Sequence, residues 1–457
     1  MFVLGYAGII FEEFFAFNKS GVALLTAVGM WSVRAAGAPS EAALNASLGE
    51  CLADVSQIVF FLIGAMTVVE TVDAHAGFKL VTDAIGTRDK KALLWLVGGL
   101  TFCMSAILDN LTSTIVMVSL LRKLVKDPEQ RKTLGAVVVI AANAGGAWTP
   151  IGDVTTTMLW INGQISSLAT MRDIFLPAAV SLVVPLALLS GDEALTGEQA
   201  SFTTRELLPL RAGAQRISLD NADDDGFPGT GMDDGLESDR EAMAPRATLV
   251  FAAGVAALVF VPVFKTATGL PPYMGMLFGL GALWLLTDAI HYGEPDRAQL
   301  KVPEALSRID TQGVLFFLGI LLAISSLDSA GVLKQLASFL DAHIPSVELI
   351  AIAIGLVSAV IDNVPLVAAT MGMYDLAEWP RDSTLWQLIA YCAGTGGSIL
   401  VIGSAAGVAF MGMEKADFVW YLRRVSPVAL AGYLAGVGTY IGMHALQAQP
   451  ALAALSG

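Results

Sequence analysis

Two stretches of the chain, MSAILDNLTSTIVM at 104–117 and VSAVIDNVPLVAAT at 357–370, decide its fold. Each places an Asp-Asn pair between two apolar arms. As helices, the arms of the second stretch, 348–361 and 365–377, are about 20 Å long, whereas the hydrocarbon core of a bilayer is about 30 Å thick. The sequence therefore predicts that 348–377 is a re-entrant hairpin whose tip stops inside a membrane. By symmetry we expect a second hairpin at 92–121, where a longer first arm leaves two full spans as the alternative.

The composition places the rest of the chain in a membrane as well. Of 457 residues, 55% are hydrophobic and 15% are charged, against roughly a quarter charged in typical soluble domains. We expect an all-α polytopic membrane protein in contact with the lipid bilayer, which excludes a soluble enzyme and a disulfide-stapled secreted domain. A net charge of -15 gives no cationic surface, so no nucleic acid partner is expected.

The remaining apolar segments give the predicted spans, since a helix needs about 20 apolar residues to cross a bilayer. Two long segments, 134–166 and 384–412, are interrupted by glycine clusters. We expect broken helices there, with Gly145, Gly146, Pro150 and Gly152 forming the breakpoint of the first. The positive-inside rule places most of the 26 basic residues on the cytoplasmic face and both termini outside. The other predicted spans are 2–17, 20–37, 55–71, 174–190, 247–264, 272–290, 312–327 and 425–446.

The two halves of the chain share one order of elements. NAGGAWTPIGD at 143–153 corresponds to GTGGSILVIGS at 394–404, as the two Asp-Asn stretches correspond to each other. We therefore predict two transmembrane repeats, 1–190 and 247–446, each with five crossings, one re-entrant hairpin and one broken helix. Because five is an odd number, the second repeat enters the membrane upside down, which is an architecture of secondary transporters.

Between the repeats, residues 191–246 are rich in Asp, Gly and Ser, and we expect a disordered acidic connector on the cytoplasmic side. A cluster of its aspartates leaves calcium binding as an alternative, although their spacing is not that of an EF-hand. Residues 447–457 are expected to be a C-terminal tail. The aspartates of the cluster are Asp223, Asp224, Asp225, Asp233 and Asp234.

Three acidic residues are predicted deep in the membrane: Asp109 and Asp362 at the hairpin tips and Asp153 at the break of 134–166. Burying a carboxylate there costs at least about 2.5 kcal/mol. One such residue could equally be a helix N-cap, but three of them, two in symmetric positions, favour a Na⁺ held by the carboxylates. Burial also raises the pKa of a carboxyl group, so that one aspartate can bind either a proton or a cation, which is sufficient for antiport.

The polar residues beside these aspartates are hard oxygen donors, which suit hard cations rather than soft metals. No His or Cys cluster is expected among them. We expect no resident cofactor, with Na⁺, Li⁺ and H⁺ as the transported ions. The predicted cation- and proton-binding residues are Asp109, Asn110, Thr112, Asn143, Thr149, Asp153, Thr155, Asp362, Asn363, Ser398 and Ser404.

The motifs SAILDNLTSTIV, AANAGGAWTPIGDVTTTMLW and SAVIDNVPLVAATMGMY resemble the NhaD-type sodium/proton antiporters of the ion transporter superfamily. The resemblance covers nearly the whole chain apart from 191–246. It implies exchange of Na⁺ and Li⁺ for H⁺, an elevator-like fold with a scaffold and a moving domain that contains the hairpins, and a homodimer. A bacterial inner membrane is the expected location, with the plastid envelope as the alternative. By motif match, the family's functional residues fall on Asp109, Asn110, Asn143, Asp153, Thr155 and Asp362.

The nearest alternative is a sodium-coupled dicarboxylate or other anion transporter of the same superfamily, because helix N-termini at hairpin tips can bind carboxylates. The negative charges of Asp109 and Asp362 at the tips disfavour it. A metalloid exporter is a third candidate. The chain contains neither H-E-x-x-H nor G-x-S-x-G, so we expect that it is not an enzyme.

Overall fold

The computed structural model describes residues 1–10, 18–37, 40–78, 87, 89–191, 246–344 and 346–455 of the chain. Within these ranges the regular secondary structure consists of nineteen α-helices and two short 3-10 helices. This confirms the expected all-α class. Most of the predicted connector, with its five clustered aspartates, lies outside the described residues, as do residues 11–17 of the first predicted span.

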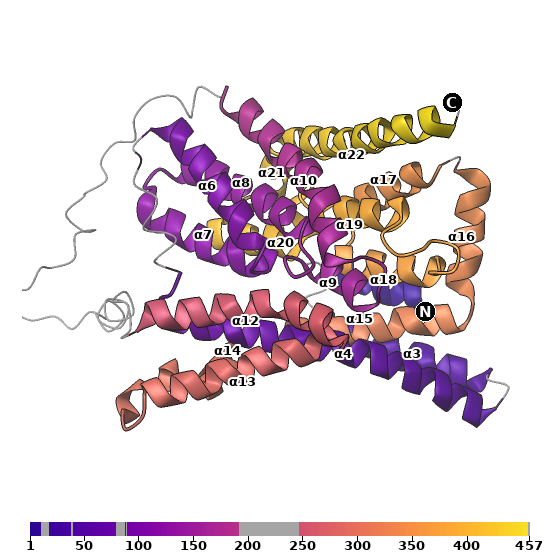
Figure 1. Ribbon diagram of the computed structural model, residues 1–457, viewed down its shortest axis with the longest axis horizontal. Helices are drawn as coiled ribbons and strands as arrows, with labels where there is room; N and C mark the ends of the chain where they lie inside the picture. The colour runs from indigo at the N-terminus through magenta and orange to yellow at the C-terminus, as the bar shows by residue number, and fades with distance from the viewer. Residues whose placement is uncertain are drawn as a thin grey trace, which may run out of the picture.

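The helices lie in two layers, and the lower layer in Figure 1 is formed by helices from both halves of the chain. This layer contains α1 (Phe2–Ile10), α3 (Lys19–Ala36), α4 (Glu41–Ala74), α12 (Ala247–Thr268), α13 (Pro272–Ile290), η2 (Pro295–Leu300), α14 (Val302–Arg308) and α15 (Thr311–Ser329). Here α3 packs along α15, α12 packs along α13, and α4 packs against α12, α13 and α15. Segments more than 200 residues apart in the sequence are thereby joined into one wall.

The upper layer surrounds one buried helix, α8. Its members are α6 (Lys90–Ser105), α7 (Asn110–Leu124), α8 (Pro128–Ala147), α9 (Val154–Ile161), α10 (Ser167–Leu189), α17 (Val347–Ser358), α18 (Asn363–Met373), α19 (Thr384–Gly396), η3 (Val401–Gly403), α20 (Ala405–Glu414), α21 (Phe418–Arg424) and α22 (Ser426–Leu455). Every residue of α8 from Leu134 to Ala147 is buried, because α6, α7, α10, α19 and α20 pack around it. α16 (Val332–His343) packs against α15 and α18 and so connects the layers (Figure 1). The expected tail continues α22 as far as Leu455.

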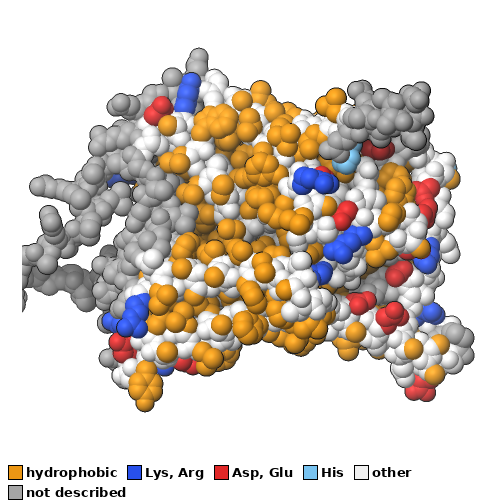
Figure 2. All heavy atoms as spheres, viewed as in Figure 1, with side chains coloured by type: hydrophobic (Ala, Val, Ile, Leu, Met, Phe, Trp, Pro, Cys, Tyr) orange, Lys and Arg blue, Asp and Glu red, His pale blue; other side chains and the backbone are white. Residues whose placement is uncertain are grey.

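Five of the described helices are long and apolar enough to cross a membrane, or up to seven spans if each bent helix pair counts as one. The five are α4, α10, α12, α13 and α15, and the bent pairs are α16 with α17, at 119°, and α21 with α22, at 51°. Figure 2 shows hydrophobic side chains over the middle of one face and charged side chains mostly toward its two ends. The protein is therefore a multi-pass membrane protein.

Two helices differ from the sequence-based expectation. The sequence predicts a span at 55–71, whereas α4 covers Glu41–Ala74, a helix about 51 Å long. The first half of α4 is less apolar. Ser40 is the N-cap of this helix, and its hydroxyl accepts a hydrogen bond from the backbone N–H of Ala43. No predicted element covers α16, which follows a left-handed turn at Gly331 (φ +74°) and is amphipathic, with Leu333 and Ala337 buried.

The break in the first long apolar segment lies at 148–153, between α8 and α9, so the breakpoint expected at Gly145 and Gly146 is wrong. Both glycines are helical residues of α8. A Cβ atom at Gly145 would collide with the backbone oxygen of Phe102, so glycine here permits close contact between α6 and α8. Pro150 and Gly152 do lie within the break. A break at the corresponding place in the second half separates α19 from α20.

Candidate ion-binding site

Asp153 is an enclosed carboxylate, with 2% of its surface exposed. It caps α9, because its Oδ1 accepts hydrogen bonds from the backbone N–H of Thr155 at 2.9 Å and from the hydroxyl of the same residue at 3.0 Å. Its Oδ2 accepts from the amide of Asn110 at 3.1 Å and from the amide of Asn363 at 3.5 Å. One carboxylate thus joins the break after α8 to the starts of both α7 and α18.

Asn143, near the end of α8, extends these hydrogen bonds to the second half of the chain. Its side-chain oxygen accepts from Asn110 at 2.9 Å, and its amide donates to the hydroxyls of Ser398 and Ser404, each at 2.9 Å. The hydroxyl of Ser404 also caps α20 by accepting from the backbone N–H of Gly407 at 3.2 Å. Buried side chains from distant parts of the sequence therefore form one polar cluster.

Asp109 and Asp362 take the same place before α7 and α18, where each is the N-cap. Asp109 accepts from the backbone N–H and the hydroxyl of Thr112, at 2.8 and 2.7 Å. Asp362 accepts from the backbone N–H of Val364 at 3.2 Å. Both carboxylates are half-buried. The capping role considered as an alternative for these residues is thus present at all three aspartates.

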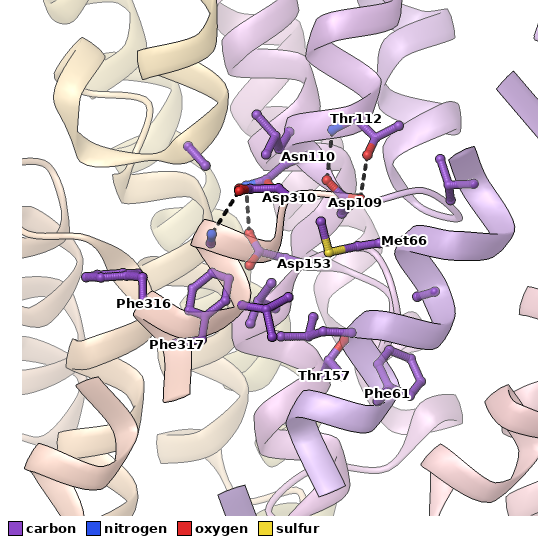
Figure 3. A pocket seen from close by; sticks show the side chains of 18 of the residues that line it. Phe61, Met66, Asp109, Asn110, Thr112, Asp153, Thr157, Asp310, Phe316 and Phe317 are labelled. Atoms are coloured by element: carbon purple, nitrogen blue, oxygen red, sulfur yellow. Dashed lines mark hydrogen bonds between the residues drawn. The ribbon is translucent and has the colours of Figure 1, made fainter. Parts of the chain in front are cut away.

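A cavity of about 190 Å³ lies between the two layers and reaches these carboxylates. At liquid density this volume holds about six water molecules, which is enough for a partly hydrated small cation. Figure 3 shows Phe61 and Met66 of α4 and Phe316 and Phe317 of α15 around the labelled polar side chains. The described polar and charged residues that line the cavity are Asn18, Lys19, Ser20, Asp109, Asn110, Thr112, Asp153, Thr157, Asp310, Gln312 and Asp362.

Six helices begin at this cavity, and the side chain of each N-cap accepts a hydrogen bond from a backbone amide of the first turn. A helix N-terminus carries about half a positive charge and by itself attracts anions. Four of the six caps are carboxylates, however, and one lysine faces them among the described lining residues. The charge around the cavity therefore favours a cation. The six caps are Asn18, Asp109, Asp153, Asp310, Asp362 and Ser404.

Comparison with known proteins identifies the family. A family model described as citrate transporter, CitMHS, matches residues 6–394. Sodium/proton antiporter 1 of Arabidopsis thaliana is 64% identical over 446 residues, which cover 98% of this chain and 72% of the relative. Sodium/proton antiporter 2 of the same plant is 59% identical over 444 residues, which cover 97% of this chain and 98% of the relative. This chain belongs to the NhaD-like sodium/proton antiporters of the CitMHS family. The Na(+)/H(+) antiporter NhaD of Vibrio cholerae is 29% identical over 469 residues, covering 96% of the chain and 89% of the relative.

Membership of the NhaD-like antiporters confirms the resemblance stated from the motifs. It also makes the protein a transporter and not an enzyme. The family does not by itself assign ligand residues in this chain, so the eleven predicted positions are placed by the structure alone.

In this NhaD-like antiporter, five predicted residues line the cavity, namely Asp109, Asn110, Thr112, Asp153 and Asp362. Five others lie behind the lining and are bonded to it within the polar cluster, namely Asn143, Thr155, Asn363, Ser398 and Ser404. Thr149 is separate, since its hydroxyl donates to the backbone oxygen of Ala106 at 2.6 Å and ties the break to the turn between α6 and α7.

The three carboxylates lie at separate points of the cavity. In the part of the chain that the structure describes, no three acidic, His or Cys side chains are close enough together to hold one metal ion. A cation at Asp153 would thus draw most of its ligands from neutral oxygens, which the adjacent amides and hydroxyls of the NhaD-like antiporter contain.

Sequence reasoning missed several cavity residues. Asp310 caps α15 by accepting from the backbone N–H of Gly313 at 2.8 Å, and its carboxylate is exposed at the cavity. An acidic residue directly before an apolar helix is the signal that marked Asp109 and Asp362, and it applies to Asp310 too. Met66 and Gln312 carry no such signal, because only the packing of α4 and α3 against α15 brings them to the cavity.

Proposed function

We propose that this protein exchanges Na⁺, and also Li⁺, for H⁺ across its membrane by alternating access, and that cation and proton compete for Asp153. The observation that carries the proposal is the setting of this carboxylate. It is 2% exposed, it lines the cavity, and its hydrogen-bond donors among the described residues are all neutral. A buried carboxylate without a cationic partner is stabilised by a proton or by a bound cation. Binding of one ion then releases the other.

The two oxygens of Asp153 have different roles in this proposal. Oδ1 is held by Thr155 and keeps the start of α9 in place. Oδ2 faces the amides of Asn110 and Asn363, and each amide group also contains an oxygen. A half-turn of either amide would replace an N–H donor by an oxygen ligand. Na⁺ would then be bound by hard oxygens from both hairpin tips.

Asp109 and Asp362 complete the proposed site from the cavity side. Both are half-buried, so they stay hydrated more than Asp153 does and can attract a cation into the cavity. Thr112 holds both oxygens of Asp109, which fixes the direction of that carboxylate. We propose that these two residues share the cation with Asp153 in turn during its passage, rather than all at once.

Proton movement in liposomes that contain the purified protein tests this function. Addition of NaCl or LiCl should dissipate an imposed pH gradient, and the response should disappear in Asp109→Asn and Asp153→Asn. Asp127→Asn is the matched control, because Asp127 caps α8 by accepting from Glu129 at 3.1 Å but is exposed and outside the cavity. Loss of the response in the control as well would mean that capping, not ion binding, explains the effect.

A second candidate is sodium-coupled transport of a dicarboxylate or another anion, because the matching family model is described as citrate transporter. The helix starts at the cavity would suit a carboxylate ligand. The four carboxylates that cap them would repel it, and for this reason we place cation exchange first. Uptake of citrate or succinate driven by Na⁺, without Na⁺-driven proton movement, would replace our proposal by this one.

We further propose that the chain consists of two inverted repeats, 1–190 and 247–446, each with five crossings, a re-entrant hairpin and a broken helix. The lengths of the hairpin arms support this: α6, α7, α17 and α18 have 16, 15, 12 and 11 residues. At 1.5 Å per residue each is about 24 Å long or less, short of the roughly 30 Å hydrocarbon core.

A single cysteine at the tip of the second hairpin tests re-entrance. Val360 is half exposed in the turn after α17, and Val360→Cys is introduced after the native cysteines Cys51, Cys103 and Cys392 are replaced. A membrane-impermeant thiol reagent added on the side opposite to the hairpin's ends should leave it unlabelled. Rapid labelling from that side would favour two full spans.

The host membrane and the assembly are proposals as well. The two Arabidopsis relatives are 64% and 59% identical, whereas the bacterial NhaD relatives are 27% to 29% identical. On this ground we place the plastid envelope ahead of the bacterial inner membrane, and fractionation of cells that express the tagged chain tests it. The homodimer is supported by the resemblance alone, and the mass of the purified protein measured by light scattering tests that.

A further inference from the structure

Two histidines outside the cavity form a buried pair that the proposed transport mechanism does not use. His75 follows the last residue of α4 and His291 follows the last residue of α13. Both residues are 0% exposed. Their Nε2 atoms lie 3.1 Å apart, which is a hydrogen-bond distance between residues 216 positions apart in the chain.

The second nitrogen of each ring already has an acceptor. Nδ1 of His75 lies 2.7 Å from the backbone oxygen of Thr71, and because a carbonyl oxygen only accepts, this Nδ1 carries a hydrogen. Nδ1 of His291 lies 3.0 Å from Oε2 of Glu294, to which Arg297 also donates at 3.2 Å. The hydrogen bond with His291 lowers the pKa of Glu294, so that this carboxylate is ionised and also only accepts.

This count of hydrogens leaves the contact between the rings one proton short. If both Nδ1 atoms carry a hydrogen and both rings are neutral, each Nε2 has a lone pair and no hydrogen. Two lone pairs would then face each other at 3.1 Å. One additional proton placed between the two Nε2 atoms converts this repulsion into an N–H···N hydrogen bond.

We propose that His75 and His291 form a proton-binding site, separate from the transport cavity, in which one shared proton ties the end of α4 to the end of α13. The ligand is H⁺ itself. The bridged pair carries one positive charge, and the ionised Glu294 bonded to His291 balances it. When the proton leaves, the two Nε2 atoms no longer attract each other and the tie between the two helices is lost.

The charged groups of the neighbouring elements pair mostly with one another. Arg308 lies 3.9 Å from Glu70 and 3.6 Å from Glu304, and Lys301 lies 4.0 Å from Asp288. Among the described side chains, Glu294 is the charged group that bonds to a ring of the pair. The charged groups at this end of α4, α12, α13, α14 and the segment with η2 are Glu70, Asp73, Arg246, Asp288, Glu294, Arg297, Lys301, Glu304 and Arg308.

The pH range of the site follows from the burial of the pair. Burial and the facing ring of His291 lower the pKa of His75 below the usual histidine value. The proton is therefore bound on mild acidification and released toward neutral and alkaline pH. A site that stays charged through the physiological pH range would instead keep its proton at neutral pH.

The pair is placed to act on transport through α4. The same helix lines the cavity with Phe61 and Met66, and Met66 lies nine residues, or about 14 Å, before His75. The segment between α13 and α15 carries Arg297, Lys301 and Arg308, on the face that the positive-inside rule assigns to the cytoplasm. Acidification on that face would fix one wall of the cavity against α13.

A titration of the histidine rings in the unsubstituted protein tests the shared proton directly. The chain has four histidines, so ¹⁵N-histidine labelling of the protein in lipid nanodiscs gives a spectrum that can be assigned by removing one ring at a time. The Nε2 signals of His75 and His291 should change together at one pH midpoint, while exposed His343 changes separately. Independent titration of the two rings, or a change produced by equimolar Zn²⁺ but not by acid, would overturn the proposal.

The variant His75→Gln tests the link to transport. A glutamine amide N–H can donate to Nε2 of His291 without an added proton, so the tie would persist at every pH. The pH dependence that the pair adds to the acidic side of the profile for Na⁺-driven proton movement should therefore be lost, with the half-saturating Na⁺ concentration at the optimum unchanged. His343→Gln is the matched control, since its Nδ1 also contacts a backbone oxygen four residues back, that of Phe339 at 2.7 Å, but its ring is exposed.

An unchanged profile in His75→Gln, or the same change in His343→Gln, would overturn the link. These results are distinguishable from a failure of the proposed antiport, because they concern the shape of the profile. Loss of Asp153 concerns whether Na⁺ moves protons at all.

Discussion

Asn110 donates a hydrogen bond to Asp153 at 3.1 Å across 43 positions of the chain, and the same amide donates to Asn143 at 2.9 Å. In this arrangement the nitrogen of Asn110, not its oxygen, points toward the carboxylate. The start of α7 and the break after α8 are therefore held together by one neutral group. Because this group contacts the carboxylate proposed to bind the ion, its chemistry should control the pH dependence of exchange.

Asn110→Asp is expected to shift Na⁺-driven proton movement toward alkaline pH and to weaken Na⁺ binding. The change places two carboxylates about 3 Å apart, and like charges at that distance cannot both ionise, so the pair keeps a proton to higher pH. The pH profile in liposomes measures the shift. Asn162→Asp, at the half-buried end of α9, is the control and should leave the profile in place.

Asn143→Ala should destabilise the protein by about 1 to 3 kcal/mol, because it removes three buried hydrogen bonds, one from the amide of Asn110 and two to the hydroxyls of Ser398 and Ser404. A lower midpoint of thermal unfolding in detergent would show this. Asn162→Ala removes a single hydrogen bond, to the backbone oxygen of Met158 at 2.9 Å, and should have a smaller effect. Equal effects of the two substitutions would contradict a special role for the cluster.

Gly145→Ala should impair folding, since its Cβ atom would meet the backbone of Phe102 and neither α6 nor α8 can give way by turning a side chain. Gly99→Ala is the matched control in α6, where nothing lies within 4 Å of the added Cβ. Alanine there should be neutral or stabilise by up to about 1 kcal/mol. The yield of folded protein from the membrane, measured by gel filtration, distinguishes the two. Normal yield of Gly145→Ala would show that the helices can separate.

Glu414→Gln should destabilise the upper layer by about 3 kcal/mol, because it removes the charge that pairs with two arginines. The Glu414 carboxylate has 1% of its side chain exposed and lies 2.9 Å from Arg122 and 2.6 Å from Arg131. Glu129→Gln breaks the exposed pair with Lys132 and should cost less than about 1 kcal/mol. Thermal unfolding measures both, and similar losses would mean that burial of Glu414 contributes little.

The sequence alone indicated the acidic part of the site. Asp109, Asp153 and Asp362 stand out because carboxylates are rare in long apolar segments. Asp109 and Asp362 are each followed by Asn, and Thr155 lies two residues after Asp153. It also indicated that Asn143 and Ser404 belong to the site, through the correspondence of their two motifs. The distance between them depends on how α8 packs against α20, and local patterns do not contain that information.

Other features could not be predicted because their partners are far apart in the sequence. The pairing of His75 with His291 requires that α4 and α13 end at the same level. Gly145 looked like a helix breaker because glycine marks both flexible backbone and close helix packing, and only the position of Phe102 shows which applies. α4 is longer than the span predicted at 55–71, because hydropathy detects the apolar segment that crosses the membrane and not the ends of the helix.

Glycines in α8, in α19 and just before α20 have a consequence for how an ion would travel. An added Cβ would meet backbone atoms of Phe102 at Gly145, of Gly355 at Gly396 and of Ala359 at Gly403. The main chain of α6 therefore touches that of α8, and the main chain of α17 and of the turn after it touches that of α19 and η3. Such contacts leave no room for sliding, and the ligands should keep their mutual positions while the protein changes shape. Na⁺ would then move as a bound ion within a rigid body formed by these helices. The rate of turnover would be limited by how fast this rigid body moves along the apolar faces of α4 and α15.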